Sequence, residues 1–119
     1  MKVLVVDDSP VMRKLVSRSI RQAGYNFDIV EAEDGQHALT VVEDEAPNLV
    51  LADWNMPNMT GIEMLRALRE KGNGITVGFV TSESTAEIRS MAEEAGASFF
   101  LSKPIDPAQL EQAFISVGL

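Results

Sequence analysis

In Lys2-Val-Leu-Val-Val-Asp-Asp-Ser-Pro10 an apolar run stops abruptly at two carboxylates, the pattern of a buried strand that ends at a polar edge. The run Val3–Val6 contains no polar residue, which is typical of a strand that is buried on both faces. It is too short for the core of a signal peptide, and no stretch approaches the roughly 20 apolar residues of a membrane span. The chain therefore begins with a buried strand, and we expect a helix to follow Ser9-Pro10.

The same alternation of strand and helix repeats along the chain. Each of five short apolar runs precedes a segment with helical spacing, and these runs are Val3–Val6, Phe27–Val30, Leu49–Ala52, Ile75–Val80 and Phe99–Leu101. Five such repeats predict a parallel sheet that is covered by helices on both faces. The second run alternates with polar residues and suits an edge, whereas the first and third suit central strands. The expected fold class is α/β, a flavodoxin-like doubly wound (βα)5 with a five-stranded parallel sheet in the order 2-1-3-4-5.

Capping signals predict where the helices begin and end. A capping oxygen stands three residues before Glu or Gln in Thr60-Gly-Ile-Glu63, Ser84-Thr-Ala-Glu87 and Asp106-Pro-Ala-Gln109. Pro107 falls at a first helical position, and the second helix is expected after Asp34-Gly35. Glycines stand where three helices should stop, at Gly24, Gly72 and Gly96. In the fourth helix the periodicity predicts one buried stripe, made of Ile88, Met91, Ala92 and Ala95.

Length and composition restrict the class of protein. The 119 residues correspond to one domain, and we expect no effector domain within residues 1–119. Cysteine is absent, which excludes thiol catalysis and cysteinyl zinc sites. The net charge of −8 opposes the phosphate neutralisation on which nucleic-acid binding depends. The simplest expectation is a cytoplasmic monomer that binds neither nucleic acid nor membrane.

Polar residues collect at one edge of the predicted sheet. Asp7 and Asp8 follow the first strand, Asp53 the third, Thr81 the fourth and Lys103 the fifth. Any one of these residues is ordinary in a turn or a cap. Because the carboxyl ends of parallel strands meet at one edge, however, all five are expected to converge, at the place where such sheets bind ligands.

Three carboxylates at this edge require a cation. At about 5 Å and an effective dielectric near 20, each pair repels by about 3 kcal/mol, which is large beside the roughly 5–15 kcal/mol that stabilises a domain. Oxygen ligands without His or Cys favour Mg²⁺, or Mn²⁺, over zinc. Together with Lys103, one divalent cation would bring the site to neutrality and prepare it for a phosphoryl group.

The motifs at these strand ends resemble those of response-regulator receiver domains of two-component signalling. The matching segments are Asp7-Asp8, Asp53-Trp54-Asn55-Met56-Pro57, Thr81 and Lys103-Pro104, so the resemblance covers the whole chain. The run that follows Asp53 is especially similar to that of single-domain chemotaxis regulators. The resemblance also implies a cis bond between Lys103 and Pro104.

The resemblance implies a role for each site residue. Asp53 would be the nucleophile that accepts a phosphoryl group from a kinase phosphohistidine and becomes an aspartyl phosphate. Mg²⁺ would be bound directly by Asp8, Asp53 and the backbone carbonyl of Asn55, and by Asp7 through water. Lys103 would offset charge on the phosphoryl oxygens.

The resemblance also implies a switch and a means of setting its lifetime. Thr81 would donate its hydroxyl to the phosphoryl group, and Phe100 would rotate into the space that this movement leaves. Asn55 and Glu83 match the positions that tune hydrolysis. The chain would thus catalyse only its own phosphorylation and dephosphorylation, without being a metabolic enzyme.

Charge patterning suggests where partners bind. The first helix carries Arg13, Lys14, Arg18 and Arg21, a basic stripe that could dock an acidic histidine kinase or phosphotransfer domain. The surface expected to face the target carries Glu87, Glu93, Glu94, Asp106 and Glu111, with Arg89 as its one base. By family analogy the target would be a flagellar motor switch protein, and a phosphatase would be a third partner.

Other functions stay open at this point. Within signalling, the chain could be a phosphorelay shuttle, a phosphate sink, or the receiver of a longer regulator. A different class, an Mg²⁺-dependent phosphohydrolase with an Asp nucleophile, also needs clustered acids and a lysine. Dehalogenase-type phosphatases, however, place a second Asp two residues after the nucleophile, where this chain has Asn55. A flavin module would need a Ser/Thr/Gly-rich loop after the first strand, and here that loop begins Asp7-Asp8.

Overall fold

A computed structural model describes all residues, 1–119. The five strands are β1 (Lys2–Val6), β2 (Asp28–Ala32), β3 (Leu49–Ala52), β4 (Thr76–Thr81) and β5 (Phe99–Ser102). The five helices are α1 (Pro10–Gln22), α2 (Gly35–Glu45), α3 (Gly61–Glu70), α4 (Ala86–Glu94) and α5 (Pro107–Ser116). All neighbouring strands pair in parallel, in the order β2-β1-β3-β4-β5, and the predicted fold class and strand order are confirmed. No helix is long and apolar enough to cross a bilayer.

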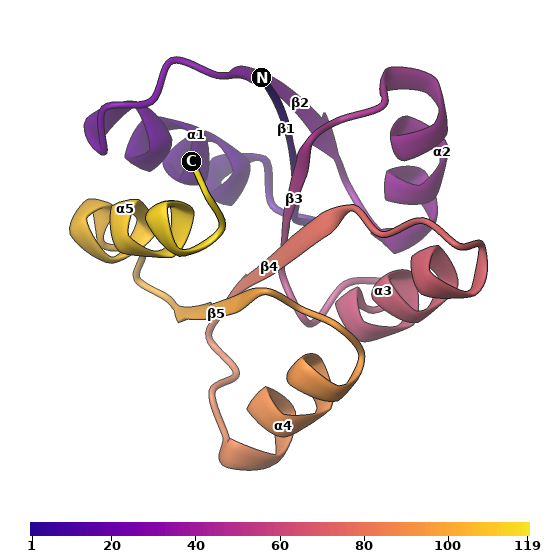
Figure 1. Cartoon of the computed structure of the whole chain (residues 1–119). Helices are drawn as coiled ribbons and strands as arrows, with labels where there is room; N and C mark the ends of the chain where they lie inside the picture. The colour runs from indigo at the N-terminus through magenta and orange to yellow at the C-terminus, as the bar shows by residue number, and fades with distance from the viewer.

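The helices cover the sheet on both faces. Helices α1 and α5 lie on one face, and α2, α3 and α4 lie on the other (Figure 1). Alternate residues of each inner strand point to opposite faces, because successive side chains in a strand do so. In β1, for example, Val3 and Val5 pack with α1 and α5, whereas Leu4 and Val6 pack with the other three helices. Two apolar cores thus hold the inner strands, as the uninterrupted apolar run of β1 predicted.

The helix caps agree with the sequence in most places. The side chains of Ser9, Asp34, Thr60 and Asp106 each accept a hydrogen bond from a backbone N–H at the start of α1, α2, α3 and α5. Thr60 and Glu63 form the complete capping box that was predicted. Glycines with positive φ follow α1, α3 and α4, because this backbone region is free of strain for glycine.

The N-terminus of α4 differs from the prediction. Its cap is Thr85, whose hydroxyl accepts from the backbone N–H of Ile88, rather than Ser84. A hydroxyl residue stands at both positions, and the spacing to Glu87 favours Ser84, whereas the structure uses Thr85 as the cap. The expected buried stripe is also wrong in part, since Met91 is exposed and Ala92 is the only fully buried residue of this helix.

Strand boundaries place the polar residues at one edge. The backbone N–H groups of Asp7, Asp53 and Lys103 donate to the carbonyls of Ala32, Val6 and Thr81, at 3.2, 3.0 and 2.9 Å. Each bond continues the ladder of a strand pair just beyond the strand. The sheet therefore fixes the backbone of three polar residues before their side chains make any contact.

Candidate phosphoacceptor and metal site

Asp7, Asp8 and Asp53 form one acidic cluster beyond the carboxyl ends of β1 and β3. One carboxylate oxygen from each lies within 4.8 Å of the others. Asp7 is buried, with 3% of its surface exposed, whereas Asp8 is exposed and Asp53 is half-buried. The cluster is thus open on the side of Asp8 and closed behind Asp7.

Lys103 joins two of these carboxylates. Its Nζ lies 2.9 Å from Oδ2 of Asp7 and 2.8 Å from Oδ2 of Asp53. The bond between Lys103 and Pro104 is cis, as the family resemblance implies. Burial by itself would lower the pKa of Lys103, but hydrogen bonds and charges from Asp53 and Asp7 outweigh it and raise the pKa above its ordinary value. The ammonium group is therefore a fixed positive charge in the site.

Every polar group of Asp7 has a partner. Its backbone N–H donates to the carbonyl of Ala32, and its backbone carbonyl accepts from Nη1 of Arg13. Oδ1 accepts from the N–H of Ser9 at 2.9 Å, and Oδ2 accepts from Lys103. Asp7 is thus held rigidly, and its charge is partly compensated within the protein.

The donor set fits a hard divalent cation. Three carboxylates and one ammonium leave the cluster with a formal charge of −2, because only Lys103 compensates it directly. Oxygen ligands without histidine or cysteine favour Mg²⁺ or Mn²⁺ over zinc. Asp8 and Asp53, the two accessible carboxylates, are the residues that would hold such an ion.

Asp53 is placed for chemistry at its carboxylate. Oδ1 accepts from the backbone N–H of Trp54 at 2.6 Å, and Oδ2 accepts from Lys103. Gly61, the first residue of α3, packs against the Asp53 carbonyl so closely that a Cβ at this position would overlap it. The half-buried carboxylate is therefore oriented by the backbone N–H of Trp54 and by Lys103, while the start of α3 packs against the backbone of Asp53.

Thr81 and Phe100 lie between the acidic cluster and α4. Thr81 is fully buried, and its hydroxyl oxygen accepts from the N–H of Glu83 at 3.2 Å. Phe100 is half-buried, with its ring centroid 6.4 Å from that of Trp54 and 6.2 Å from that of Phe79. The guanidinium of Arg89 covers the ring at 4.9 Å. An aromatic cluster thus connects the residue next to Asp53 with the surface of α4 and β5.

Asn55 and Glu83 meet at the mouth of the site. The side-chain amide of Asn55 donates to Oε1 of Glu83 at 3.1 Å, and both residues are exposed. The sequence indicated each position separately, but it could not show the contact. The pair connects the loop that follows β3 with the loop that follows β4.

Arg13 does not lie where the sequence placed it. It was expected on an exposed basic stripe, yet only 16% of its side chain is exposed. Its Nε pairs with Oε1 of Glu31 at 2.8 Å, and its Nη1 donates to the Asp7 carbonyl at 2.6 Å. Lys14, Arg18 and Arg21 are exposed, as predicted. No sequence motif signals the contact with Glu31, because the two residues belong to different elements.

Comparisons with known proteins agree with this geometry. Residues 3–115 match the family described as the response regulator receiver domain. Chemotaxis protein CheY-3 of Vibrio cholerae is 36% identical over 114 residues, which cover 94% of this chain and 87% of that protein. Chemotaxis protein CheY of Pseudomonas aeruginosa is 35% identical, with 94% and 91% covered. Among solved structures, Vibrio cholerae CheY4 superposes with a TM-score of 0.86 at 32% identity, covering 98% of this chain and 97% of that one.

Proposed function

Because the chain belongs to the response regulator receiver domain family, we propose that it is a switch activated by phosphorylation of Asp53. The observation that carries the proposal is the half-buried Asp53 carboxylate, held 2.8 Å from Lys103 beside two further carboxylates. Such an arrangement positions a nucleophile next to a fixed positive charge and a cation-binding group. These are the parts that phosphoryl transfer requires.

The phosphoryl group would come from the phosphohistidine of a kinase or phosphotransfer domain. A carboxylate oxygen of Asp53 would form a bond to phosphorus while the phosphorus–nitrogen bond breaks, and the released imidazole nitrogen would take up a proton. Lys103 would stay close to the phosphoryl oxygens as they take the place of the present carboxylate contact. Bound Mg²⁺ would supply further charge compensation for those oxygens.

Removal of the phosphoryl group would be hydrolysis at the same phosphorus. Water would attack phosphorus, the bond to Asp53 would break, and inorganic phosphate would leave with the carboxylate restored. The hydrogen-bonded pair of Asn55 and Glu83 stands at the mouth of the site and would set the access of water or of a phosphatase. Equal dephosphorylation rates in wild type, Asn55→Ala and Glu83→Ala would contradict this role. We propose no further catalytic activity for the chain.

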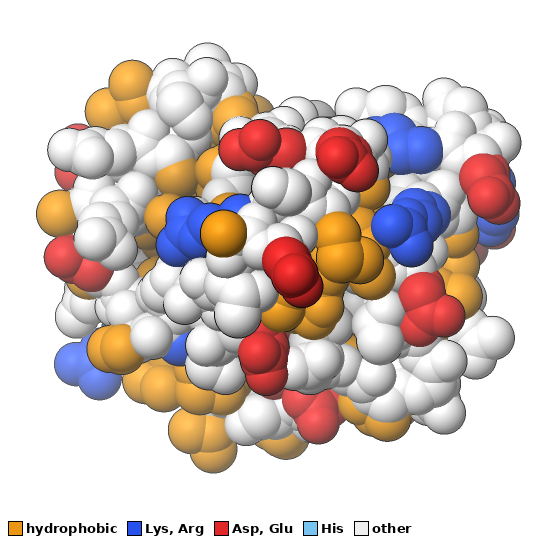
Figure 2. All heavy atoms as spheres, turned by 90° about the horizontal axis from the view of Figure 1, so that it is seen from below, with side chains coloured by type: hydrophobic (Ala, Val, Ile, Leu, Met, Phe, Trp, Pro, Cys, Tyr) orange, Lys and Arg blue, Asp and Glu red, His pale blue; other side chains and the backbone are white.

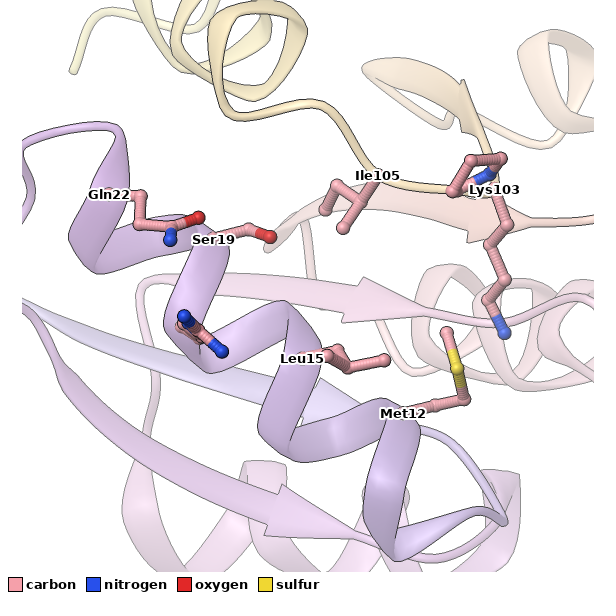
Figure 3. A pocket seen from close by; sticks show the side chains of 8 residues that line it. Met12, Leu15, Ser19, Gln22, Lys103 and Ile105 are labelled. Atoms are coloured by element: carbon pink, nitrogen blue, oxygen red, sulfur yellow. The ribbon is translucent and has the colours of Figure 1, made fainter.

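The kinase would dock on α1 and the loop that follows β5. These two elements line a groove of about 600 Å³ with Lys103 at one end (Figure 3). Met12, Leu15 and Ile105 supply apolar side chains, and Arg18 also lines the groove. Lys14 and Arg21 extend the positive charge along the exposed side of α1, which would attract an acidic partner. Reversing Arg18 and Lys14 to Glu should slow phosphorylation by a kinase but leave phosphorylation by a small phosphodonor unchanged.

The output surface would be that of α4, β5 and α5. When Thr81 turns its hydroxyl toward the phosphoryl group, its contact with the N–H of Glu83 is lost, and Phe100 can move inward beside Trp54 and Phe79. The view of the side on which α4 lies shows acidic side chains among hydrophobic ones (Figure 2). Chemotactic control of a flagellar motor is the proposed setting, because the relatives reported above are chemotaxis proteins. A cytoplasmic location belongs to the same proposal and stays a prediction.

Trp54 offers a direct test of this function. It is the only tryptophan, and its ring centroid lies 5.1 Å from that of Phe79. Its backbone N–H donates to Oδ1 of Asp53. Mg²⁺ followed by a small phosphodonor such as acetyl phosphate should change its fluorescence in two steps. Asp53→Asn should abolish the second step. A phosphodonor response that survives in Asp53→Asn would refute Asp53 as the acceptor, and continuous release of phosphate from added esters would indicate a phosphohydrolase instead.

A further inference from the structure

Arg13 reaches from the first turn of α1 to the backbone of the acidic cluster. Its two contacts use different nitrogens, Nε toward Glu31 at 2.8 Å and Nη1 toward the Asp7 carbonyl at 2.6 Å. The planar guanidinium fixes the angle between these two donors. When Glu31 holds Nε, the direction of Nη1 toward the Asp7 carbonyl is therefore fixed as well. Only 16% of the side chain is exposed, although it belongs to a helix whose other bases are exposed.

Glu31 anchors this arginine to the edge of the sheet. It is paired in register with Val5, and the next residue along β2, Ala32, accepts the N–H of Asp7. Both backbone groups of Asp7 are therefore tied to the end of β2, the N–H directly and the carbonyl through Arg13 and Glu31. The connection holds the first residue beyond β1 in one orientation.

The Asp7 carbonyl belongs to the peptide unit that leads to Asp8. Since a peptide unit is planar, fixing its carbonyl also fixes its N–H and the direction in which the chain enters Asp8. The carboxylate of Asp8 is exposed, so its direction depends on the backbone that carries it more than on packing. Arg13 therefore contacts the peptide unit that carries Asp8, the most exposed of the three carboxylates.

We propose that Arg13 is a positioning residue for the divalent-cation site, acting through the peptide unit between Asp7 and Asp8. This inference rests on the proposed function, because it needs a cation that binds at Asp8 and Asp53. Mutation of a group that orients a metal ligand typically weakens metal binding by about 10- to 100-fold.

The sign of the effect separates positioning from charge. Removing a positive charge near a cation site strengthens cation binding if only Coulomb interactions change. Loss of the hold on the Asp7 carbonyl weakens cation binding instead. Arg13→Ala removes both the charge and the hold on the carbonyl, whereas Arg13→Lys keeps the charge but cannot make the two contacts in the same fixed plane.

The experiment is a titration of the chain of residues 1–119 with Mg²⁺, followed by Trp54 fluorescence. We expect Arg13→Ala and Arg13→Lys each to raise the Kd for Mg²⁺, by about tenfold for Arg13→Ala. Arg66→Ala, which removes an exposed arginine from α3, is the matched control and should leave the Kd unchanged. Far-UV circular dichroism identifies any variant that does not fold.

The outcomes are distinct. A folded Arg13→Ala whose Kd equals or falls below that of wild type overturns the inference, because the weaker binding expected from lost positioning is then absent. If Arg13→Ala does not fold, Arg13→Lys decides in the same way, because it keeps the positive charge but loses the two fixed contacts. A change in thermal stability without a change in Kd would mean that the contact only stabilises the fold. If wild-type fluorescence does not respond to Mg²⁺ at all, the proposed function fails first.

Discussion

Replacing Asp8 with asparagine should stabilise the protein without Mg²⁺ and remove most of the stabilisation that Mg²⁺ provides. Asp8 lies within 4.8 Å of two further carboxylates, and Lys103 pairs with Asp7 and Asp53 rather than with Asp8. The substitution therefore removes two repulsive pairs and leaves both ion pairs in place.

The magnitude follows from the distance. At 4.8 Å and an effective dielectric of about 20, each pair of carboxylates repels by about 3 kcal/mol. Asp8 is exposed, so water and salt screen its interactions to values typical of surface charges, about 1 kcal/mol in all. We therefore expect Asp8→Asn to raise the free energy of unfolding by about 1 kcal/mol in EDTA, a Tm increase of about 3–5 °C for a domain of this size.

Mg²⁺ should reverse the order of stability, so that wild type becomes more stable than Asp8→Asn. A cation that binds only the folded state stabilises it by RT ln(1 + [Mg²⁺]/Kd), and this gain belongs mainly to wild type. Urea unfolding followed by far-UV circular dichroism, in EDTA and in excess Mg²⁺, measures both effects. The electrostatic account of the site would be refuted if Asp8→Asn were less stable than wild type in EDTA. It would also be refuted if Mg²⁺ stabilised Asp8→Asn as much as wild type.

Two further predictions concern the cap of α2 and the glycine that packs against Asp53, and a third concerns how stability changes at low pH. Asp34→Ala removes the cap of α2 and should lower the free energy of unfolding by about 1–2 kcal/mol in urea titrations. Gly61→Ala places a Cβ against the Asp53 carbonyl and should cost about 1–3 kcal/mol and slow labelling of Asp53 by acetyl phosphate; a labelling rate equal to that of wild type would contradict this. The N–H of His37, followed by the amide of Asn58, lowers the pKa of Asp34 from its ordinary 3.8. The ionised form is therefore stabilised by folding. The difference in free energy of unfolding between wild type and Asp34→Ala should be largest above about pH 4 and should shrink as the pH falls below it. A gap that does not change with pH would be inconsistent with this shift.

Much of the fold follows from local patterns. The runs Val3–Val6 and Leu49–Ala52 are apolar without interruption because both faces of these strands are covered, and the sequence therefore reports their position directly. Caps such as Ser9 and Thr60 are recognisable because the partner of each side chain lies three residues away. Where two hydroxyl residues adjoin, as in Ser84-Thr85, the spacing to the next Glu favours the residue that does not cap the helix.

Helix α4 shows why burial is harder to predict. Its apolar residues have helical spacing, but only Ala92 is fully buried and Met91 faces solvent. Periodicity identifies the apolar side of a helix, whereas the width of the buried stripe depends on how closely the helix approaches the sheet.

The candidate site was predictable to the extent that strand ends define it. Asp7, Asp53 and Lys103 each follow a strand, and parallel strands bring their carboxyl ends together. Contacts between side chains from separate loops were not predictable. Arg13 looked like one base among four on an exposed helix face, and only the structure shows it bonded to Glu31 and to the Asp7 carbonyl.

Whether Asp53 accepts a phosphoryl group is measured by the mass of the intact protein after incubation with acetyl phosphate. We expect the addition of one phosphoryl group, dependent on Mg²⁺, in wild type and none in Asp53→Asn. A wild-type protein that gains no mass under these conditions, or an Asp53→Asn protein that gains the same mass, would contradict Asp53 as the phosphoacceptor of this receiver domain.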